Sequence, residues 1–172
     1  GYAVYHFESA VNQTSSVSGG PTLKKTGSPT VTTGVAGNGA TSFSTSNYYS
    51  NTNFGFITEN HGAGNAKTTI MWLKTASYTT TQTPLCSTTG TVRGFNITID
   101  SSVIGLRYRC NDGYYASYDK ATTNTDWVMV SCALNGTTQV SNVAIDGTIN
   151  NSSTSTFTSA TCTTNQQWVG YS

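Results

Sequence analysis

The sequence predicts an all-β fold, a sandwich of antiparallel strands, from three observations. The 172-residue chain has only two glutamates, Glu8 and Glu59, and charged residues make up 9% of it, so long surface helices are not expected. Aromatic residues make up 11%, which is enough to build a core and more than a disordered chain would carry. Short runs rich in Thr, Val, Tyr and Phe alternate with turn-rich segments along the whole chain, as in a β-sandwich.

The N-terminal part of the chain contains the first expected strands. Residues 2–8 form the first candidate, and a loop rich in Ser and Gly follows it as far as Pro21. Residues 41–44 and 54–57 are later strand candidates, and residues 60–65 are expected to be a loop.

Two segments are expected to be strands that are buried in the sandwich. Residues 68–74 carry apolar side chains on both faces, which predicts a central strand. Residues 127–134 have the same character and end at the turn dipeptide Asn135-Gly136. Because Trp72 and Trp127 lie within these apolar runs, both indoles are expected in the core.

The C-terminal part contains the clearest local patterns. Residues 94–100 alternate, with Phe95, Ile97 and Ile99 on one side, and a turn at 100–103 predicts a hairpin with the next strand. Asp146-Gly147 is a turn dipeptide that ends another strand. The strands expected in this part are at 94–100, 104–110, 114–118, 140–145 and 167–171. No linker or internal repeat interrupts the chain, so a single domain over residues 1–172 is expected.

Several of these segments occur in an order that is typical of one superfamily. They are the opening Val4-Tyr-His-Phe-Glu8, the glycine-rich 34–43, Thr69-Ile-Met-Trp-Leu-Lys74, the segment 127–147 that ends in Asp-Gly, and Trp168-Val-Gly170. With these segments the chain resembles the laminin-G-like, concanavalin-A-like jelly-roll superfamily over most of its length. The resemblance implies an antiparallel two-sheet jelly roll. It also implies recognition of glycans or proteins more often than catalysis, commonly on bacterial surface proteins and phage virions.

The chain departs from that superfamily in two respects. The family continues after the strand that 168–170 resembles with one more strand, whereas this sequence stops at Ser172. A partner chain or a further segment is therefore expected to complete the sheet. Family members that bind calcium use acidic residues, of which only Glu8 has a counterpart here, so the resemblance gives little support for calcium.

The four cysteines are spaced too widely for a zinc motif. They are Cys86, Cys110, Cys132 and Cys162. No pair has the Cys-x-x-Cys spacing of a zinc site, and no histidine lies near one. Cys132 shares strand parity with Val128 and Val130, which favours a buried thiol, while the even number also allows two disulfides. Both alternatives stay open at this level.

Charge and hydropathy exclude two classes of partner. The net charge is +1 and the cations are scattered, so no nucleic-acid partner is expected. No apolar run approaches the roughly 18 residues of a membrane-spanning helix, so no membrane insertion is expected.

The acidic residues do not form the pair that sugar hydrolysis needs. A glycosidase requires two carboxylates on either side of one bond, and the seven acids here are well separated in the sequence. Asp100, Asp126 and Asp146 stand at turns, where a carboxylate that caps the backbone is the usual role. His6 and His61 have no evident nucleophile beside them. The sequence therefore predicts a protein that is not an enzyme.

Two groups of aromatic and amide residues match the chemistry of a sugar site. Aromatic faces stack on the C–H surfaces of sugars, and amides or carboxylates fix their orientation through hydrogen bonds. The candidate ligand-binding residues, with the ordinary half-buried strand tyrosine as the competing interpretation, are Asn111, Asp112, Tyr114, Tyr115, Tyr118, Tyr48 and Tyr49. Asn111, Asp112 and Asp119 also offer oxygen ligands for calcium, although so few acids make a calcium site a minor possibility and no metal site is assigned.

Together these observations predict a carbohydrate-binding or adhesion domain of an extracellular or virion-surface protein. Its expected partner is a glycan or a receptor on a host surface. A surface rich in Thr, Ser, Asn and Gly and poor in charge also suits a subunit packed among its own copies. The alternative is therefore a decoration or fibre subunit that contacts mainly neighbouring structural subunits or forms a homo-oligomer.

Overall fold

The computed structural model describes residues 3–35, 39–52, 66–86, 88–89, 92–93, 95–100, 103–110, 114–135, 140–154 and 167–171. The predicted all-β fold is confirmed, since every regular element in these ranges is a strand. The strands are β1 (Gln13–Thr14), β2 (Thr22–Thr26), β3 (Thr30–Thr32), β4 (Ala40–Ser42), β5 (Tyr48–Asn51), β6 (Ala66–Leu73), β7 (Gln82–Cys86), β8 (Thr88–Thr89), β9 (Val92–Arg93), β10 (Phe95–Asp100), β11 (Val103–Cys110), β12 (Tyr114–Ala121), β13 (Val128–Asn135), β14 (Val140–Ile145), β15 (Thr148–Thr154) and β16 (Gln167–Tyr171).

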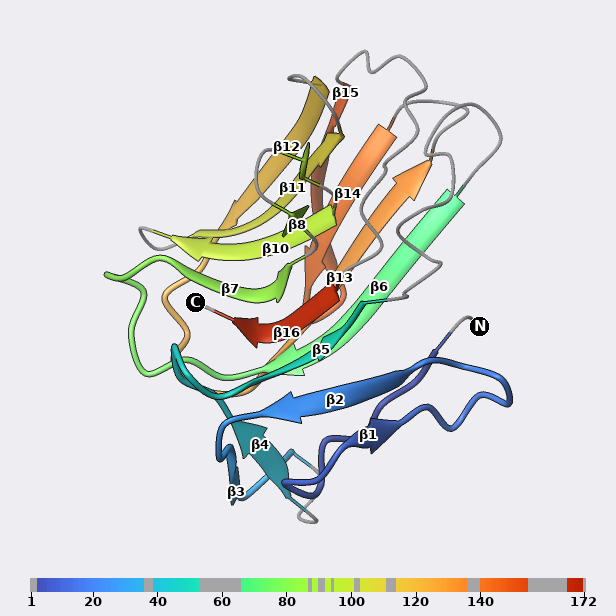
Figure 1. Cartoon of the computed structure of the whole chain (residues 1–172). Coiled ribbons are helices and arrows are strands. Elements are labelled where there is room, and N and C mark those ends of the chain that lie inside the picture. The colour runs from blue at the N-terminus through green and yellow to red at the C-terminus, as the bar shows by residue number, and fades with distance from the viewer. Residues whose placement is uncertain are drawn as a thin grey trace.

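Two antiparallel sheets make up the sandwich. The large sheet has eight strands in the order β1-β2-β5-β16-β7-β10-β11-β12, and the small sheet has four in the order β15-β14-β13-β6. Two further ribbons, β3-β4 and β8-β9, have two strands each. Figure 1 shows the small sheet beside the β10–β12 part of the large sheet, with β1 to β4 grouped at the bottom of the view.

The core lies between the sheets and comes from both of them. On the large sheet, neighbouring strands bring Tyr49, Val169, Leu85 and Ile97 into one register row, and all are buried. The inward positions of the small sheet alternate with outward ones, as the pleat requires. Its buried residues are Leu73, Val128, Val130, Cys132, Val143 and Ile145.

The turn between β14 and β15 forms as the sequence predicts. Ile145 pairs with Thr148, which leaves Asp146 and Gly147 as a two-residue loop. Both have positive φ, 49° and 77°, the combination that a type I′ hairpin turn requires. Met129 anchors the turn from β13, because its N–H donates to Asp146 Oδ1 at 2.8 Å and its C=O accepts from Asp146 N–H at 2.9 Å.

Two sequence expectations about strands are wrong. Residues 3–8 alternate between half-buried and exposed but do not join a ladder. Ser16 N–H donates to the Val4 carbonyl, and the Thr41 hydroxyl donates to the Phe7 carbonyl. The segment 68–74 was expected to be central, yet among the described strands β6 stands at the edge of the small sheet, where it pairs with β13. Apolar residues on both faces of a strand do not reveal how many neighbours it has, since an outward apolar face can also be exposed.

Other strand expectations are confirmed, and some fall on residues that the structure does not describe. The hairpin of β10 and β11 pairs Asp100 with Val103, and Ile97 and Ile99 are buried as predicted. The final described strand, β16, lies inside the large sheet with β5 on one side and β7 on the other. The candidates at 54–57 and 60–65 fall outside the described residues, and the single domain over 1–172 stays a prediction.

Candidate functional site

The outward face of the small sheet carries large exposed apolar side chains. On β6 the outward positions are Thr68, Ile70 and Trp72, because Met71 and Leu73 on the other side pack toward the core. Ile70 is 64% exposed and Trp72 is 52% exposed. We call this surface the Trp72 face, and its outward positions are Thr68, Ile70, Trp72, Met129, Ser131, Ala133, Asn142, Ala144 and Ile149.

Trp72 corrects the expectation that its indole lies in the core. The sequence contained a signal for this outcome, since Thr68 and Lys74 share strand parity with Trp72 and polar residues usually mark the solvent side. The second tryptophan, Trp127, is half-buried rather than buried and directly precedes β13. Because Trp72 pairs with Met129, two residues after Trp127, the two tryptophans are diagonal neighbours on the sheet, roughly 7–8 Å apart at their Cα atoms.

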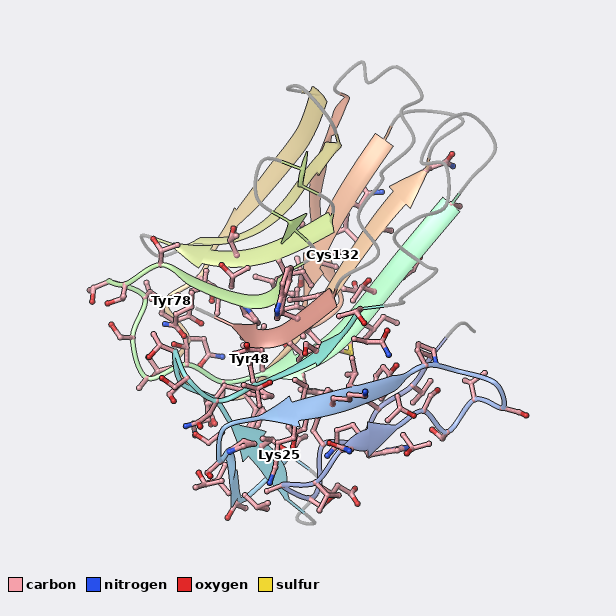
Figure 2. All side chains as sticks on the ribbon, in the orientation of Figure 1. Lys25, Tyr48, Tyr78 and Cys132 are labelled. Carbon is pink, nitrogen blue, oxygen red and sulfur yellow. The ribbon has the colours of Figure 1, made fainter. Side chains whose placement is uncertain are left out.

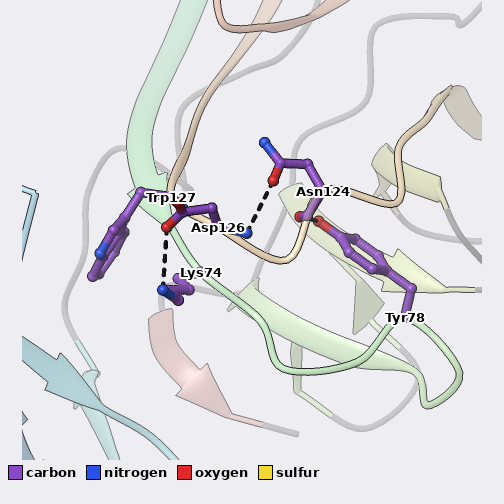
Figure 3. Close-up of polar contacts among 5 residues, drawn as sticks. All are labelled: Lys74, Tyr78, Asn124, Asp126 and Trp127. Atoms are coloured by element: carbon purple, nitrogen blue, oxygen red, sulfur yellow. Dashed lines mark hydrogen bonds and ion pairs between the residues drawn. The ribbon is translucent and has the colours of Figure 1, made fainter.

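An ion pair lies at the end of this face. The Lys74 ammonium is 3.1 Å from Asp126 Oδ1, and the same oxygen accepts the N–H of Trp127 at 2.8 Å. Figure 3 shows Lys74, Asp126 and the ring of Trp127 close together. The Trp127 N–H and then Lys74 hold the pKa of Asp126 below its ordinary value. In the described part of the chain, no residue hydrogen-bonds to Asp126 Oδ2, so that oxygen is available to a ligand donor.

Two loops hold this ion pair in position. The loop 74–81 follows β6, and the loop 122–127 precedes β13. The buried Tyr78 hydroxyl donates to the Asn124 carbonyl and ties the loops together, as Figure 3 shows. Asn124 Oδ1 then accepts the Asp126 N–H at 3.0 Å, so the backbone around the carboxylate is fixed from two directions.

The tyrosines predicted at the C-terminal sugar site lie on β12, but not on one face. Tyr114 and Tyr118 occupy one face of the strand and Tyr115 the other, because successive residues alternate. Through β11, the position of Tyr118 falls in the same register row as Ile97 of β10. Their predicted companions Asn111 and Asp112 lie outside the described residues.

Tyr48 and Tyr49 are separated in the same way. Tyr49 is fully buried, its hydroxyl donates to the Ser9 carbonyl at 3.1 Å, and its ring meets Phe43 edge-on at 5.9 Å. It therefore has no exposed surface to offer a ligand. Tyr48 is half-buried and points away from Tyr49, and Figure 2 labels it on β5. By strand register Tyr48 shares the outer side of the large sheet with the position of Tyr115, several strands away.

The described residues contain no cluster of three or more His, Cys, Asp or Glu side chains that could hold a metal ion. Cys132 is a free, buried thiol, so the alternative of two disulfides is wrong for this structure. It lies between the sheets in Figure 2, and burial raises its pKa to about 12. Within the described ranges, no helix is both long and apolar enough to cross a membrane.

Among the known proteins compared, only solved structures are similar to this chain, and they support its fold. No family model and no curated protein matches the chain. One similar structure is that of botulinum neurotoxin type C, whose cell entry depends on two ganglioside molecules, with a TM-score of 0.70 and 11% identity over 91% of this chain and 39% of that one. Another is the binding domain of botulinum neurotoxin DC in complex with rat synaptotagmin II, with a TM-score of 0.67 and 10% identity over 95% of this chain and 44% of that one.

A third similar structure comes from a secreted enzyme. It is domain 4 of AbnA, a GH43 extracellular arabinanase from Geobacillus stearothermophilus, in complex with arabinotriose. Its TM-score is 0.67 and its identity 15%, over 99% of this chain and 82% of that one. This chain therefore spans most of the arabinanase domain but less than half of the toxin chains. The likeness of this chain to all three is a likeness of fold and agrees with a jelly-roll-like sandwich, while membership of the laminin-G-like superfamily stays a prediction.

Proposed function

We propose that this chain is a non-enzymatic carbohydrate-binding domain of an extracellular or virion-surface protein. The observation that carries the proposal is the exposed indole of Trp72 at one end of a sheet face, next to the Lys74–Asp126 pair. Similar structures that bind gangliosides, arabinotriose or a protein receptor support a binding role and an extracellular setting.

The chemistry of the Trp72 face matches what a sugar presents. The indole of Trp72 provides a flat apolar surface for the C–H face of a sugar ring. Asp126 Oδ2 accepts from a sugar hydroxyl, and the Lys74 ammonium has further protons to donate beyond the one directed at Asp126. Because the Trp127 N–H and Lys74 already orient the carboxylate, little side-chain freedom is lost when a ligand binds.

The tyrosines remain a second proposed surface. By register the positions of Tyr48 and Tyr115 fall on the same alternating set of the large sheet, and the positions of Tyr114 and Tyr118 fall on the other. We therefore keep Tyr48 and Tyr115 as the pair that a ligand on the large sheet would contact, together with Asn111 and Asp112.

A glycan array followed by calorimetry tests both surfaces. The array carries arabino-oligosaccharides, ganglioside head groups and common host glycans. Trp72→Ala is expected to weaken binding at least about tenfold without changing the circular dichroism spectrum, because an exposed side chain is removed. The variant Tyr48→Ala/Tyr115→Ala tests the second surface, and it should lose binding only if the ligand lies on the large sheet.

Other results would change the assignment. If the tyrosine variant loses binding and Trp72→Ala keeps it, the site belongs to the large sheet. If the unchanged domain binds no glycan, the carbohydrate function is wrong.

A structural role is the second candidate, and exposed aliphatic residues favour it. Ile70 and Ile149 are 64% and 65% exposed, and such side chains often mark contacts between subunits. In this case the domain is a decoration or fibre subunit that contacts its own copies. Sedimentation equilibrium separates the two functions, since a subunit assembles without any glycan.

A further inference from the structure

Beyond the indole, the Trp72 face continues as a strip across all four strands of the small sheet. Strand register places Ile70, Ser131, Ala144 and Ile149 in one row from β6 to β15. The two isoleucines at its ends are exposed, Ser131 is half-buried, and the small Ala144 between them is buried. The row covers three spacings between strands, or roughly 14 Å. It begins beside Trp72, which stands two positions from Ile70 on β6. A ligand stacked on Trp72 that is longer than one sugar ring would therefore reach further residues of the same face.

Polar groups are interleaved with the apolar ones along this strip. The neighbouring row contains Thr68, Ala133 and Asn142, and the central row contains Ser131. Hydroxyl and amide groups between apolar side chains match the alternation of C–H and O–H groups on a sugar chain. A protein interface would instead favour a continuous apolar centre.

The charges around the face disfavour an anionic ligand. At the Trp72 end of the face, the Lys74 ammonium is already paired with Asp126. A second carboxylate, Asp146, stands at the turn beside Met129. With Asp126 and Asp146 beside one paired lysine, the Trp72 end of the face offers no unpaired cation to sulfated, sialylated or uronic sugars, and its carboxylates repel them.

From this geometry we infer that the Trp72 face binds a linear neutral polysaccharide along several sugar units, across the strands from Trp72 to Ile149. This inference rests on the proposed carbohydrate function and names its ligand class. Trp72, Lys74 and Asp126 hold the first unit, and Ile149 contacts a unit further along the chain. The domain then recognises the interior of a polymer rather than its end.

A ladder of linear neutral oligosaccharides tests the inference by calorimetry. The probes are arabino-, xylo- and cello-oligosaccharides from dimers to hexamers, with a sialylated trisaccharide for comparison. Affinity is expected to rise about tenfold from dimer to hexamer in the series that binds. Ile149→Ser should remove most of that gain and leave dimer binding unchanged, whereas Trp72→Ala should weaken both. Val11→Ser, at a position 60% exposed and away from the face, is the matched control.

The outcomes separate this inference from the function on which it rests. No binding at any length overturns both. Equal binding of dimers and hexamers, or tighter binding of the sialylated probe, overturns the inference and leaves a carbohydrate site at Trp72. If Ile149→Ser instead converts a dimer into a monomer in sedimentation and hexamer binding is unchanged, the strip is an interface between copies and the inference is wrong.

Discussion

Lys74 and Asp126 are 52 positions apart in the sequence, and their side chains meet at 3.1 Å at the end of the small sheet. The contact joins the residue after β6 to the loop before β13. It therefore links the end of the strand that carries Trp72 to the segment that carries Trp127. Both partners are at least half exposed, and exposed ion pairs contribute little to stability. We therefore expect this pair to matter for binding more than for folding.

The pH dependence of binding follows from the Asp126 carboxylate. Its folded-state pKa is lowered, first by the Trp127 N–H and then by Lys74. A lowered pKa means that the charged form persists as pH falls, and is lost only when pH drops through the folded value. The acid midpoint of sugar affinity should thus lie below the ordinary pKa of an aspartate side chain.

Asp126→Asn tests this assignment by calorimetry at several pH values. We expect weaker binding at every pH and a melting temperature close to that of the unchanged domain. A wild-type affinity whose acid midpoint lies above the ordinary pKa of aspartate would show that Asp126 does not hold the ligand as proposed.

The buried thiol of Cys132 should be unreactive in the folded protein. Its pKa of about 12 arises from burial in the core, so the thiolate that attacks disulfide reagents is scarce at neutral pH. Ellman's reagent should label Cys132 only after unfolding. Peptide mapping after a timed reaction distinguishes Cys132 from the other three cysteines. Rapid labelling of Cys132 in the native protein would contradict its buried position.

The same thiol links stability to alkaline pH. The pKa of the Cys132 thiol is higher in the folded protein than in the unfolded one. The contribution of this thiol to the free energy of unfolding is therefore complete below the unfolded pKa of roughly 8.5. It is lost as pH rises from there toward the folded value of about 12. Cys132→Ala should flatten this part of the curve of unfolding free energy against pH.

Gly170 should tolerate no side chain. Its φ is 77°, and an added Cβ would stand 2.1 Å from Phe43 Cγ. The left-handed backbone alone costs a non-glycine residue about 1–2 kcal/mol, and the overlap adds about 1–3 kcal/mol. Urea unfolding of Gly170→Ala should show a loss in the free energy of unfolding equal to the sum of these two costs.

Gly147→Ala is the matched control for that measurement. It has the same φ of 77° but no atom within 4 Å of the added Cβ, so only the backbone cost of about 1–2 kcal/mol is expected. Equal losses in the two variants would show that Phe43 does not press on Gly170.

Removing the Tyr78 hydroxyl should loosen the two loops at the site. Tyr78 is buried and its hydroxyl donates to the Asn124 carbonyl, a bond between segments 46 residues apart. Tyr78→Phe should cost about 1 kcal/mol in the free energy of unfolding, the usual net value of one hydrogen bond. Amide exchange in 122–127 should accelerate at the same time. Unchanged exchange would mean that the loop is held by other contacts.

Local patterns in the sequence were enough where neighbouring residues decide the structure. The alternation of Ile97 and Ile99 predicted the inward face of β10, and Asp146-Gly147 predicted the turn between β14 and β15. Both features depend on periodicity and backbone preference within a few residues. The parity of Cys132 with Val128 likewise predicted its burial. The site was harder, because the candidate Tyr114, Tyr115 and Tyr118 are close in sequence and yet divide between two faces of one strand.

The sequence by itself determined the class of fold and the local strands and turns, because composition and alternation act over short distances. Only the tertiary structure decided that β6 stands outermost among the described strands of its sheet, that Tyr49 is in the core and that Trp72 is exposed. The physical reason is that burial depends on which strand lies beside a residue and what covers each face of the sheet. Those neighbours, such as Met129 beside Trp72 and Asp126 beside Lys74, come from distant parts of the chain.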